Sequence, residues 1–390
     1  MKETKFKNTE IGKIPEEWKM YSIGKDCSVK ARIGWQGLTT SEYLQTGHYG
    51  LITSTDLIEG KVNWDTCVFV SEERYKQDTN IIVKNGDVLV SKDGTIGKVA
   101  VVSNLQYPTT LNSGVFVIRT KNEKITQEGL GLVFISPYFK DFIKRLTAGS
   151  TIVHLYQKDI VNFTFPIPTL PEQHHIASAL TSIDNLIFSL GKLIEKKKNI
   201  KQGAMQQLLT GKIRLKEFNE PWVEKKFGEL FEIGNGKDYK NLKSGPIPVF
   251  GTGGLMTYVN EYLYDGETIC IGRKGTIDKP QYHKGKIWTV DTLFYTYRFK
   301  DINVKYLYYL STTINWNEYN TATGVPSLTS QNILKIKVVL PLEEEQQAIA
   351  TILTKMDNEI TALETKKAKY EAIKQGMMQQ LLTGKIRLIS

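Results

Sequence analysis

The chain has 390 residues, of which 41% are hydrophobic and 24% charged, values typical of a globular protein with two to four domains. No run of about 18 apolar residues occurs, so the sequence predicts no membrane span, and its first residues lack the apolar core of a signal peptide. The formal net charge of +10 indicates a polyanionic partner, nucleic acid rather than a membrane. We therefore expect a cytoplasmic protein that binds nucleic acid.

Cysteine and histidine usage argues against a metal site. Cys27, Cys67 and Cys270 are far apart and form no C-x-x-C pair, which predicts free thiols in a reducing compartment. His174 and His175 are adjacent, so on a helix they would point about 100° apart and could not chelate one ion together. We therefore expect no bound metal.

The first segment is predicted to consist mainly of β-structure. After Trp18, which we expect to anchor a small core, residues 20–120 hold short β-type runs punctuated by Gly, Asn and Asp. Residues 128–147 instead carry apolar side chains at helical spacing, interrupted at Pro137. The segment is therefore mixed, with strands first and helices after them.

A long helix is predicted after Pro168. Pro171 suits the first helical position, and Glu172 suits the positive end of the helix dipole. With Gly211 as a C-cap, the helix would cover about 38 residues, or about 57 Å. Its apolar residues step by four and three, the pattern of a coiled-coil seam, at Ile176, Leu180, Ile183, Ile187, Leu190 and Ile194.

The second segment repeats this order. Residues 216–339 are rich in β-type runs, with a helix predicted over residues 304–316. A second long helix is predicted after Pro341, with three glutamates in its first turn. Its seam is Ile349, Leu353, Met356, Ile360 and Leu363, continued less regularly by Tyr370 and Ile373.

The two long helices end in nearly the same sequence. IKQGAMQQLLTGKIRL at residues 200–215 returns as IKQGMMQQLLTGKIRL at residues 373–388. Two matching seams most simply pack on each other, although each could instead dock on its own domain. Gly203 and Gly376 occupy the same place in both copies, which indicates either a helix break or the close approach of another backbone.

The two β-rich segments also share a basic turn. Residues 91–98 (SKDGTIGK) resemble residues 272–279 (GRKGTIDK). Cations, hydroxyls and exposed glycine backbone suit phosphate contacts, although the same turns could be solvated hairpin tips. With Arg32 added from the first segment, the candidate DNA-binding residues are Arg32, Lys92, Thr95, Lys98, Arg273, Lys274, Thr276 and Lys279.

The second segment is also rich in tyrosine. These rings could stack on bases, but packing in a small core is the simpler expectation. The residues are Tyr258, Tyr262, Tyr264, Tyr295, Tyr297, Tyr308 and Tyr309. The glycine-rich runs at residues 234–236 and 251–254 lack the strand-to-helix context of a nucleotide site, so we predict turns there.

The repeated framework carries interiors that differ in length and sequence, which predicts a ligand with two unlike halves, and duplex DNA suits this description. On these features the chain resembles the specificity subunits of type I restriction-modification systems. The resemblance covers the whole chain: the tryptophan near the start of each half, the Gly-Thr-Ile turn, PTLPEQ at residues 168–173, and QGxMQQLLTGKIRL at residues 202–215 and 375–388. The second copy departs at Glu344, where the first has Pro171, and we expect only a softer helix start.

The resemblance implies an α+β fold with two β-rich target-recognition domains and two long helices in an antiparallel coiled coil, related by pseudo-two-fold symmetry. The expected parts are residues 1–167 (first recognition domain), 168–212 (first spacer helix), 213–340 (second recognition domain) and 341–390 (second spacer helix). It further implies a non-catalytic subunit that reads a split site in double-stranded DNA. Two methyltransferase subunits and two motor-nuclease subunits of the prokaryotic complex would supply S-adenosylmethionine, ATP and Mg²⁺, and this chain would bind no cofactor.

Two other functions stay open from the sequence. The chain could be a coiled-coil DNA-binding scaffold without base specificity, or a metal-dependent nuclease. The nearest acid-plus-lysine cluster is Asp265 and Glu267 with Arg273 and Lys274, whose spacing does not fit a metal-nuclease core. The sequence contains no Walker A phosphate loop and no Pro-Pro dipeptide, so the Asn/Asp-Pro-Pro-aromatic loop of amino-methyltransferases is missing.

Overall fold

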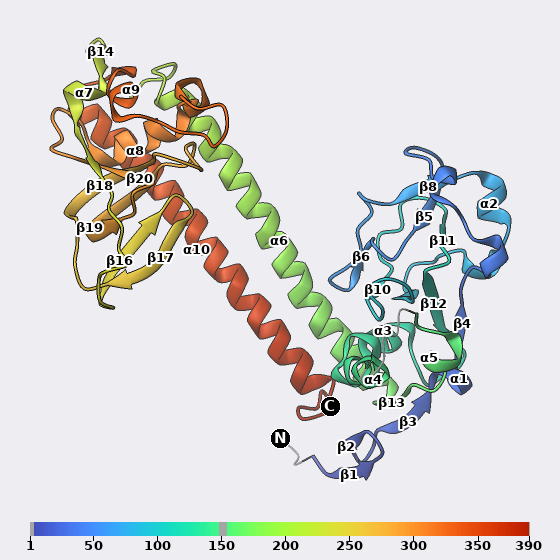
Figure 1. Cartoon of the computed structure of the whole chain (residues 1–390). Helices are drawn as coiled ribbons and strands as arrows, with labels where there is room; N and C mark the ends of the chain where they lie inside the picture. Colours follow the sequence, from blue (N-terminus) through green and yellow to red (C-terminus); the bar gives the residue numbers. More distant parts are fainter. Residues whose placement is uncertain (1–3, 148–153, 390) are drawn as a thin grey trace. The chain divides into compact units, whose positions relative to one another are not determined.

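The computed structural model describes residues 4–147 and 154–389, and the chain falls into two compact units. Unit 1 contains residues 1–189 and 367–390, and unit 2 contains residues 190–366. Each unit holds one mixed α/β domain and one stretch of each of two long helices (Figure 1).

A four-stranded antiparallel sheet forms the centre of unit 1, in the strand order β10-β9-β12-β4. The sheet is buried on both faces, because Val88 and Val90 point into one apolar core and Leu89 into another. This double burial explains why the strand reads as a continuous apolar run rather than an alternating one. The strands are β4 (Cys27–Lys30), β9 (Val88–Ser91), β10 (Val99–Val101) and β12 (Val115–Thr120).

One face of this sheet is covered by helices and the other by an insertion. The helices are α3 (Gln127–Ile135) and α4 (Pro137–Thr147), so the predicted interruption at Pro137 is confirmed, since this proline begins α4. The insertion joins β4 to β9 and contributes to a second sheet of order β11-β5-β8. Its elements and their partner strand are β5 (Tyr49–Ile52), β6 (Leu57–Ile58), β7 (Lys61–Val62), β8 (Val68–Val70), α2 (Glu72–Lys76) and β11 (Thr109–Leu111).

Unit 2 is built on a six-stranded sheet of order β15-β20-β18-β19-β16-β17. Its first four strands, in the order β19-β18-β20-β15, repeat the order β10-β9-β12-β4 of unit 1. The hairpin β16–β17 extends the sheet beyond β19, whereas the corresponding place beside β10 in unit 1 holds the shorter hairpin β6–β7, which meets β10 through a parallel bridge between Gly60 and Ala100. The strands are β15 (Glu232–Asn235), β16 (Ile247–Gly251), β17 (Gly254–Val259), β18 (Tyr264–Gly272), β19 (Gln281–Thr289) and β20 (Leu293–Tyr297).

The smaller elements also repeat. The strands at the borders of each domain pair antiparallel with each other, β3 (Lys19–Ser22) with β13 (Thr164–Ile167) and β14 (Val223–Lys226) with β21 (Lys337–Leu340). Helix α8 follows β20 as α3 follows β12, and it ends three residues before the predicted limit. The remaining elements are β1 (Phe6–Thr9), β2 (Gly12–Pro15), α1 (Ile23–Asp26), α5 (Gln157–Ile160), α7 (Phe227–Leu230), α8 (Val304–Thr313) and α9 (Ser330–Leu334).

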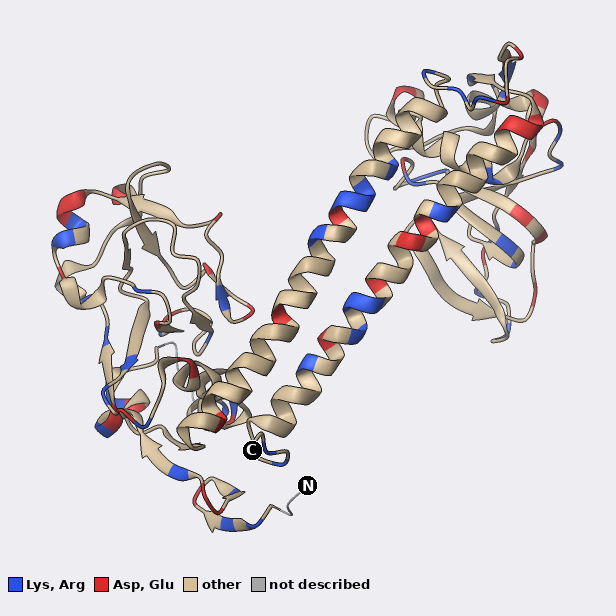
Figure 2. Ribbon diagram, turned by 180° about the vertical axis from the view of Figure 1, so that it is seen from behind, with Lys and Arg blue, Asp and Glu red and all other residues tan. Residues whose placement is uncertain are grey.

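The two long helices are α6 (Leu170–Leu208) and α10 (Glu343–Leu381), and each has 39 residues. They run antiparallel, and equivalent ion pairs join them in the two units. In unit 1 Lys374 Nζ lies 2.6 Å from Asp184 Oδ1, and in unit 2 Lys201 Nζ lies 2.5 Å from Asp357 Oδ1. Basic and acidic residues recur along both helices (Figure 2).

Both packing modes considered for the seams occur. Ile176 and Leu180 pack against Leu381 at the end of α10 and Leu382 just after it, and also against partly buried residues of α3. In unit 2, Ile349 and Leu353 join the core of the domain together with Met205 and Leu208 of α6 and the following Leu209. The predicted seam residues Ile183, Leu190 and Ile360 are buried as well, whereas Ile187, Met356 and Leu363 are half-buried and Ile373 is 40% exposed.

The repeated sequence fastens the end of each long helix to the start of the other. In unit 1, Arg387 Nε and Nη2 donate to the two carboxylate oxygens of Glu172 at 2.6 and 2.8 Å, and Trp18 Nε1 donates to Oε2 at 3.1 Å. In unit 2 the same three-residue clamp is made by Arg214, Trp222 and Glu345. Both glutamates are 1% exposed, so each carboxylate is a buried charge with its partners in place.

Neither interpretation of Gly203 and Gly376 is correct. Both lie inside continuous α-helix, so neither is a break. A Cβ at either position would meet no atom within 4 Å, so no backbone within the described chain approaches them. The glycines that follow the helix ends are Gly211 after α6 and Gly384 after α10, with φ values of 68° and 69°.

Within the described residues, no helix is both long enough and apolar enough to cross a membrane. All three cysteines are free and buried. Burial raises the pKa of the Cys27 and Cys67 thiols to about 12, so these side chains are inert packing groups rather than nucleophiles.

Candidate nucleic-acid interface

Unit 1 presents its basic turn at the tip of the β9–β10 hairpin. The turn is fixed by the backbone of Lys92. Its N–H donates to Gly114 O at 2.9 Å, just before β12, and its carbonyl accepts from Leu155 N at 2.8 Å. The tip is therefore held from two sides and presents its side chains on a rigid base.

Unit 2 presents an equivalent turn at the tip of the β18–β19 hairpin. Arg273 N donates to Thr292 O at 2.8 Å, just before β20, and Arg273 O accepts from Leu328 N at 2.9 Å. These contacts reproduce those of Lys92. The shared turn found in the sequence is thus a shared three-dimensional structure.

The first cation of each turn lies over a phenylalanine of the neighbouring strand. Lys92 Nζ is 5.5 Å from the centroid of the Phe116 ring, and Arg273 Cζ is 5.8 Å from that of Phe294. A cation over an aromatic face gains roughly 0.5–1 kcal/mol at exposed sites. Each cation is therefore partly oriented before any ligand arrives.

The second residue of the turn differs in charge between the units. In unit 1 it is Asp93, whose Oδ1 lies 2.8 Å from His154 Nδ1, and the two residues also form a backbone bridge. In unit 2 it is the exposed Lys274, which bridges to Ser327. The two turns therefore share a framework but offer a different charge to a ligand.

The structure places seven of the eight predicted DNA-binding residues on these two tips. The side chains of Lys92, Lys98 and Thr276 are half-buried, and those of Thr95, Arg273, Lys274 and Lys279 are exposed. The tips are solvated, as the alternative interpretation also expected.

The structure does not support Arg32 as a DNA-binding residue. Arg32 is 1% exposed and its guanidinium is occupied by the protein. Nε donates to Leu111 O at 2.9 Å, Nη1 to Gln77 Oε1 at 3.0 Å, and Nη2 to Arg74 O at 3.2 Å and Thr110 Oγ1 at 3.1 Å. Arg32 fastens the insertion of unit 1 to β11 and offers nothing to DNA.

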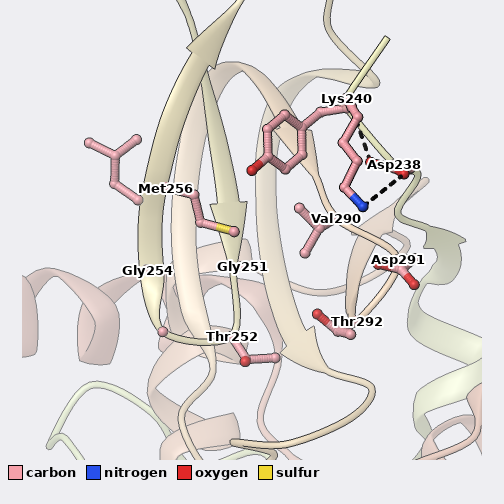
Figure 3. Close-up of a pocket in the computed structure, with 12 residues that line it drawn as sticks. Asp238, Lys240, Gly251, Thr252, Gly254, Met256, Val290, Asp291 and Thr292 are labelled. Carbon is pink, nitrogen blue, oxygen red and sulfur yellow. Dashed lines mark hydrogen bonds and ion pairs between the residues drawn. The ribbon is translucent and has the colours of Figure 1, made fainter. Parts of the chain in front are cut away.

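A groove of about 650 Å³ opens beside the basic tip of unit 2 (Figure 3). One wall is the tip of the β16–β17 hairpin, and the opposite wall is the loop at residues 290–292. Thr292 accepts the hydrogen bond from Arg273, so the second wall continues directly into the basic turn. The lining side chains that carry charge are Asp238, Lys240 and Asp291.

A β-bulge turns Met256 into this groove. Val249 pairs with Thr257 and Phe250 with Leu255, so Met256 is an extra residue without a partner on β16. Its sulfur lies over Gly251, where a Cβ would be 2.7 Å from Sδ. Any larger residue at Gly251 would displace Met256, which remains 54% exposed.

The tip end of the hairpin is held by β19. Gln281 Nε2 donates to Gly251 O at 2.9 Å, and His283 stacks on Phe250 with ring centroids 3.7 Å apart. Burial lowers the pKa of His283 to about 4, so the imidazole is neutral near neutral pH.

Some tyrosines of unit 2 pack in its core, as the simpler expectation held, and others are exposed and could stack on bases. Tyr309 is 1% exposed in the core of unit 2, whereas Tyr258 and Tyr262 are about half exposed. The glycine-rich run at residues 251–254 is a turn, as predicted, and forms the hairpin tip. The run at residues 234–236 is not a simple turn, because Gly234 lies within β15.

The Glu267 carboxylate is held by neighbouring side chains and is not free to bind a metal ion. Glu267 accepts from Tyr282 Oη at 2.6 Å and lies 3.3 Å from Lys284 Nζ. The hydrogen bond from Tyr282 is the main cause that lowers the pKa of this carboxyl. Within the described ranges, no group of three His, Cys, Asp or Glu side chains is placed to hold a metal ion.

The repeated domain is the feature that identifies the family. A family model described as the type I restriction modification DNA specificity domain matches residues 15–202 and again residues 219–375. This chain belongs to that family. Each match runs from the start of one half into a long helix, so the family's domain occurs twice.

Relatives cover the full length of the chain. The MjaVIII specificity subunit of a type I restriction enzyme from Methanocaldococcus jannaschii is 26% identical, covering 99% of this chain and 97% of that protein. The putative MjaX specificity subunit from the same organism is 27% identical, covering 99% and 98%. The resemblance read from the repeats is therefore confirmed.

Solved structures agree on the fold. The crystal structure of a type I restriction-modification S subunit from M. genitalium gives a TM-score of 0.63 at 18% identity, covering 93% of this chain and 96% of that one. The predicted α+β fold, with two repeated domains and two paired long helices, is confirmed.

The sequence missed the groove. The sequence predicts only a turn at residues 251–254, and Lys240, Met256 and Asp291 are not among the predicted DNA-binding residues. One signal of this surface lies in the sequence just after residue 254, where Leu255, Met256 and Tyr258 follow one another closely. An exposed edge strand rarely displays three large apolar side chains, so their presence on β17 indicates a binding surface.

Proposed function

We propose that this chain is the DNA sequence-recognition subunit of a type I restriction-modification complex and has no catalytic site of its own. One observation carries the proposal: two sheets that share a four-strand order present equivalent basic tips, while the structures beside the tips differ. A shared framework with unlike surroundings suits two related positions on one duplex that differ in sequence. The family membership and the net charge of +10 support double-stranded DNA as the ligand.

Each unit would read one half of a split site. The half-buried and exposed cations of the tips would contact phosphates and set the position of each domain, because phosphate contacts orient a protein without reading sequence. The neighbouring side chains, which differ between the units, would contact base edges. The division into two recognition domains, residues 1–167 and 213–340, and two spacer helices, residues 168–212 and 341–390, belongs to this proposal.

The paired helices α6 and α10 would set the number of unread base pairs between the half-sites. They would also offer repeated surfaces to two methyltransferase subunits, with two motor-nuclease subunits completing the complex. One similar structure is described in terms of complex assembly of the type I R-M system, at a TM-score of 0.57. In this proposal the partners carry S-adenosylmethionine, ATP and Mg²⁺, and the complex acts on DNA in the cytoplasm.

Two other functions have less support. A scaffold without base specificity would not need a different side-chain set beside each tip. A nuclease centred on Glu267 would need that carboxylate free for a metal ion, whereas Tyr282 and Lys284 already occupy it.

The test is co-expression of the chain with its methyltransferase partner, followed by methylome sequencing of the cell. We expect one split motif, and loss of modification without either protein. Replacing residues 1–165 with the equivalent part of another specificity subunit should change one half-site and leave the other. A motif that survives this exchange unchanged would contradict the half-site assignment, and methylation without a fixed motif would favour the scaffold.

A further inference from the structure

We propose that the groove between the β16–β17 hairpin and the loop at residues 290–292 is where unit 2 reads bases, with Lys240, Met256 and Asp291 as its specificity-determining side chains. The inference rests on the proposed function and goes beyond it, because it assigns sequence reading in unit 2 to one surface. Within the described residues Lys240 makes one weak ion pair, the Asp291 carboxylate makes no hydrogen bond or ion pair, and Met256 is 54% exposed.

The chemistry of the groove matches that of base edges. Lys240 is a hydrogen-bond donor of the kind that binds guanine O6 and N7, and a carboxylate accepts from the amino group of cytosine. Met256 supplies an apolar contact, as the methyl group of thymine requires. A site built only for phosphate would need cations and backbone N–H groups, and two carboxylates in its lining would oppose binding. The mixture of Lys240, Asp238 and Asp291 therefore favours recognition of base edges over non-specific binding of phosphates.

These side chains are available to a ligand. Lys240 Nζ lies 3.9 Å from Asp238 Oδ2 with 80% and 61% of the two side chains exposed, so this ion pair is weak and easily exchanged. The Asp291 carboxylate makes no ion pair or hydrogen bond within residues 4–147 and 154–389, although its backbone carbonyl accepts from Arg273. Figure 3 shows Lys240 and Asp238 joined on one side of the groove, with Met256 on the hairpin strand.

The shape of the hairpin suits entry into DNA. The major groove admits a two-stranded β-ribbon, and β16–β17 is such a ribbon at the edge of the sheet. Its tip is a tight turn closed by the pair Gly251 and Gly254, and Gly254 has a φ of 106°, a conformation that favours glycine. Leu255, Met256 and Tyr258 are each at least half exposed on the outer strand, so the ribbon carries apolar side chains that no other described residue covers.

The basic turn next to the groove indicates DNA rather than an apolar partner protein. Arg273 and Lys274 are exposed and share a backbone hydrogen-bond acceptor with the groove wall, since both N–H groups donate to Thr292 O at 2.8 and 3.2 Å. Phosphates bound to these cations would run beside the groove, and the base edges would face its lining. At the corresponding place unit 1 has the two-residue strands β6 and β7 instead of the longer β16–β17 hairpin, so the groove lined by Lys240, Met256 and Asp291 belongs to one half-site.

The experiment uses the full chain assembled with its methyltransferase partner. Lys240→Gln, Met256→Ala and Asp291→Asn are compared with wild type by methylome sequencing, and by methylation of duplexes with each base of the wild-type motif substituted in turn. The half-site of unit 2 is the one retained when residues 1–165 are exchanged. We expect each variant to relax the preference at one or two bases of this half-site, with discrimination falling about 10- to 100-fold.

The matched control is Lys335→Gln, which removes one exposed lysine of unit 2 that does not line the groove. It should leave the motif and its stringency unchanged. Thermal unfolding of each complex separates a folding defect from a reading defect. As a phosphate-contact comparison, Lys274→Gln should weaken binding at all bases alike and reduce the salt dependence of affinity.

The outcomes are distinguishable. If the wild-type complex yields no split motif, the proposed function fails first. If it yields a split motif and all three groove variants keep full discrimination in both half-sites, the groove does not read bases and the inference is wrong. Relaxed bases in the half-site of unit 1 would also overturn it, and so would loss of complex assembly with normal DNA preference, because the hairpin would then be a protein interface.

Discussion

Arg387 donates two hydrogen bonds to Glu172, a residue 215 positions earlier in the chain. The contact joins the segment after α10 to the first turn of α6. Its equivalent, Arg214 with Glu345, joins the segment after α6 to the first turn of α10. The repeated arginine thus serves the opposite helix rather than its own.

Replacing Arg387 should destabilise unit 1. Arg387→Ala would leave the Glu172 carboxylate buried with only Trp18 as a donor, and breaking a buried pair in this way costs about 3 kcal/mol. Arg387→Lys should recover part of the loss, because an ammonium keeps the charge but cannot donate in the same two-pronged geometry. Urea unfolding measures the change. Lys385→Ala, at an exposed neighbour, is the control, and an equal loss there would contradict the clamp.

Exchanging the charges of Asp184 and Lys374 tests the helix pairing. Lys374→Asp alone places two carboxylates together and should destabilise the pair by about 0.2–1 kcal/mol, the range of exposed ion pairs. Adding Asp184→Lys should restore stability. The equivalent exchange at Asp357 and Lys201 should behave alike in unit 2, although Tyr309 also donates to Asp357 there at 2.7 Å. A double exchange no better than the single change would contradict the contact.

Alanine at Gly203 or Gly376 should stabilise the protein by about 1 kcal/mol each, since both sites are helical with open space around them. Thermal unfolding of the isolated chain checks this expectation. Gly211→Ala is the contrasting variant. It should be destabilising, because Gly211 has a φ of 68° and the added Cβ would lie 3.4 Å from the Trp222 ring. Lower stability of Gly203→Ala would mean that the helix is strained there. Assembly with the methyltransferase should be measured in parallel, because a partner could use the open face.

His283 should make stability depend on pH. Its pKa is about 4 in the folded chain and near 6.5 when unfolded, because burial disfavours the charged ring. The unfolded chain therefore binds a proton between these values while the folded chain does not. Stability is full above about pH 6.5 and falls as the pH decreases towards about 4, by about 1–2 kcal/mol after allowance for solvent screening. His283→Gln should flatten urea-unfolding stability across this window, and His48→Gln, at an exposed site, should not.

Lengthening both long helices tests whether they set the number of unread base pairs in the proposed split site. Four residues added after Leu190 in α6 and four after Lys367 in α10 would lengthen the pair by about 6 Å while keeping its register. We expect the unread spacer to grow by about two base pairs, as measured by methylome sequencing. The insertion in α6 alone should break the register and abolish modification. Unchanged spacing in the double insertion would show that the helices do not set it.

Patterns within the sequence predict the duplicated plan of the molecule. The offset of 173 residues paired Lys374 with Lys201 and Glu172 with Glu345, and the heptad spacing located both long helices to within a few residues. These signals are local or repetitive: apolar periodicity follows the geometry of one helix, and a near-identical repeat survives whatever the rest of the chain does.

Contacts between distant segments determine which copy of the repeat binds which long helix, and which side chains are free to bind a ligand. Arg32 is a DNA-binding candidate in the sequence, yet folding buries it among four acceptors supplied from residues 74–111. The sequence carries no prediction for Met256, yet a bulge at an edge strand exposes it. Burial and strand register depend on contacts between distant segments, and no spacing within one segment records them. The repeat at the helix ends therefore indicates a duplication. The fold shows that the arginine of each copy binds the glutamate at the start of the opposite long helix.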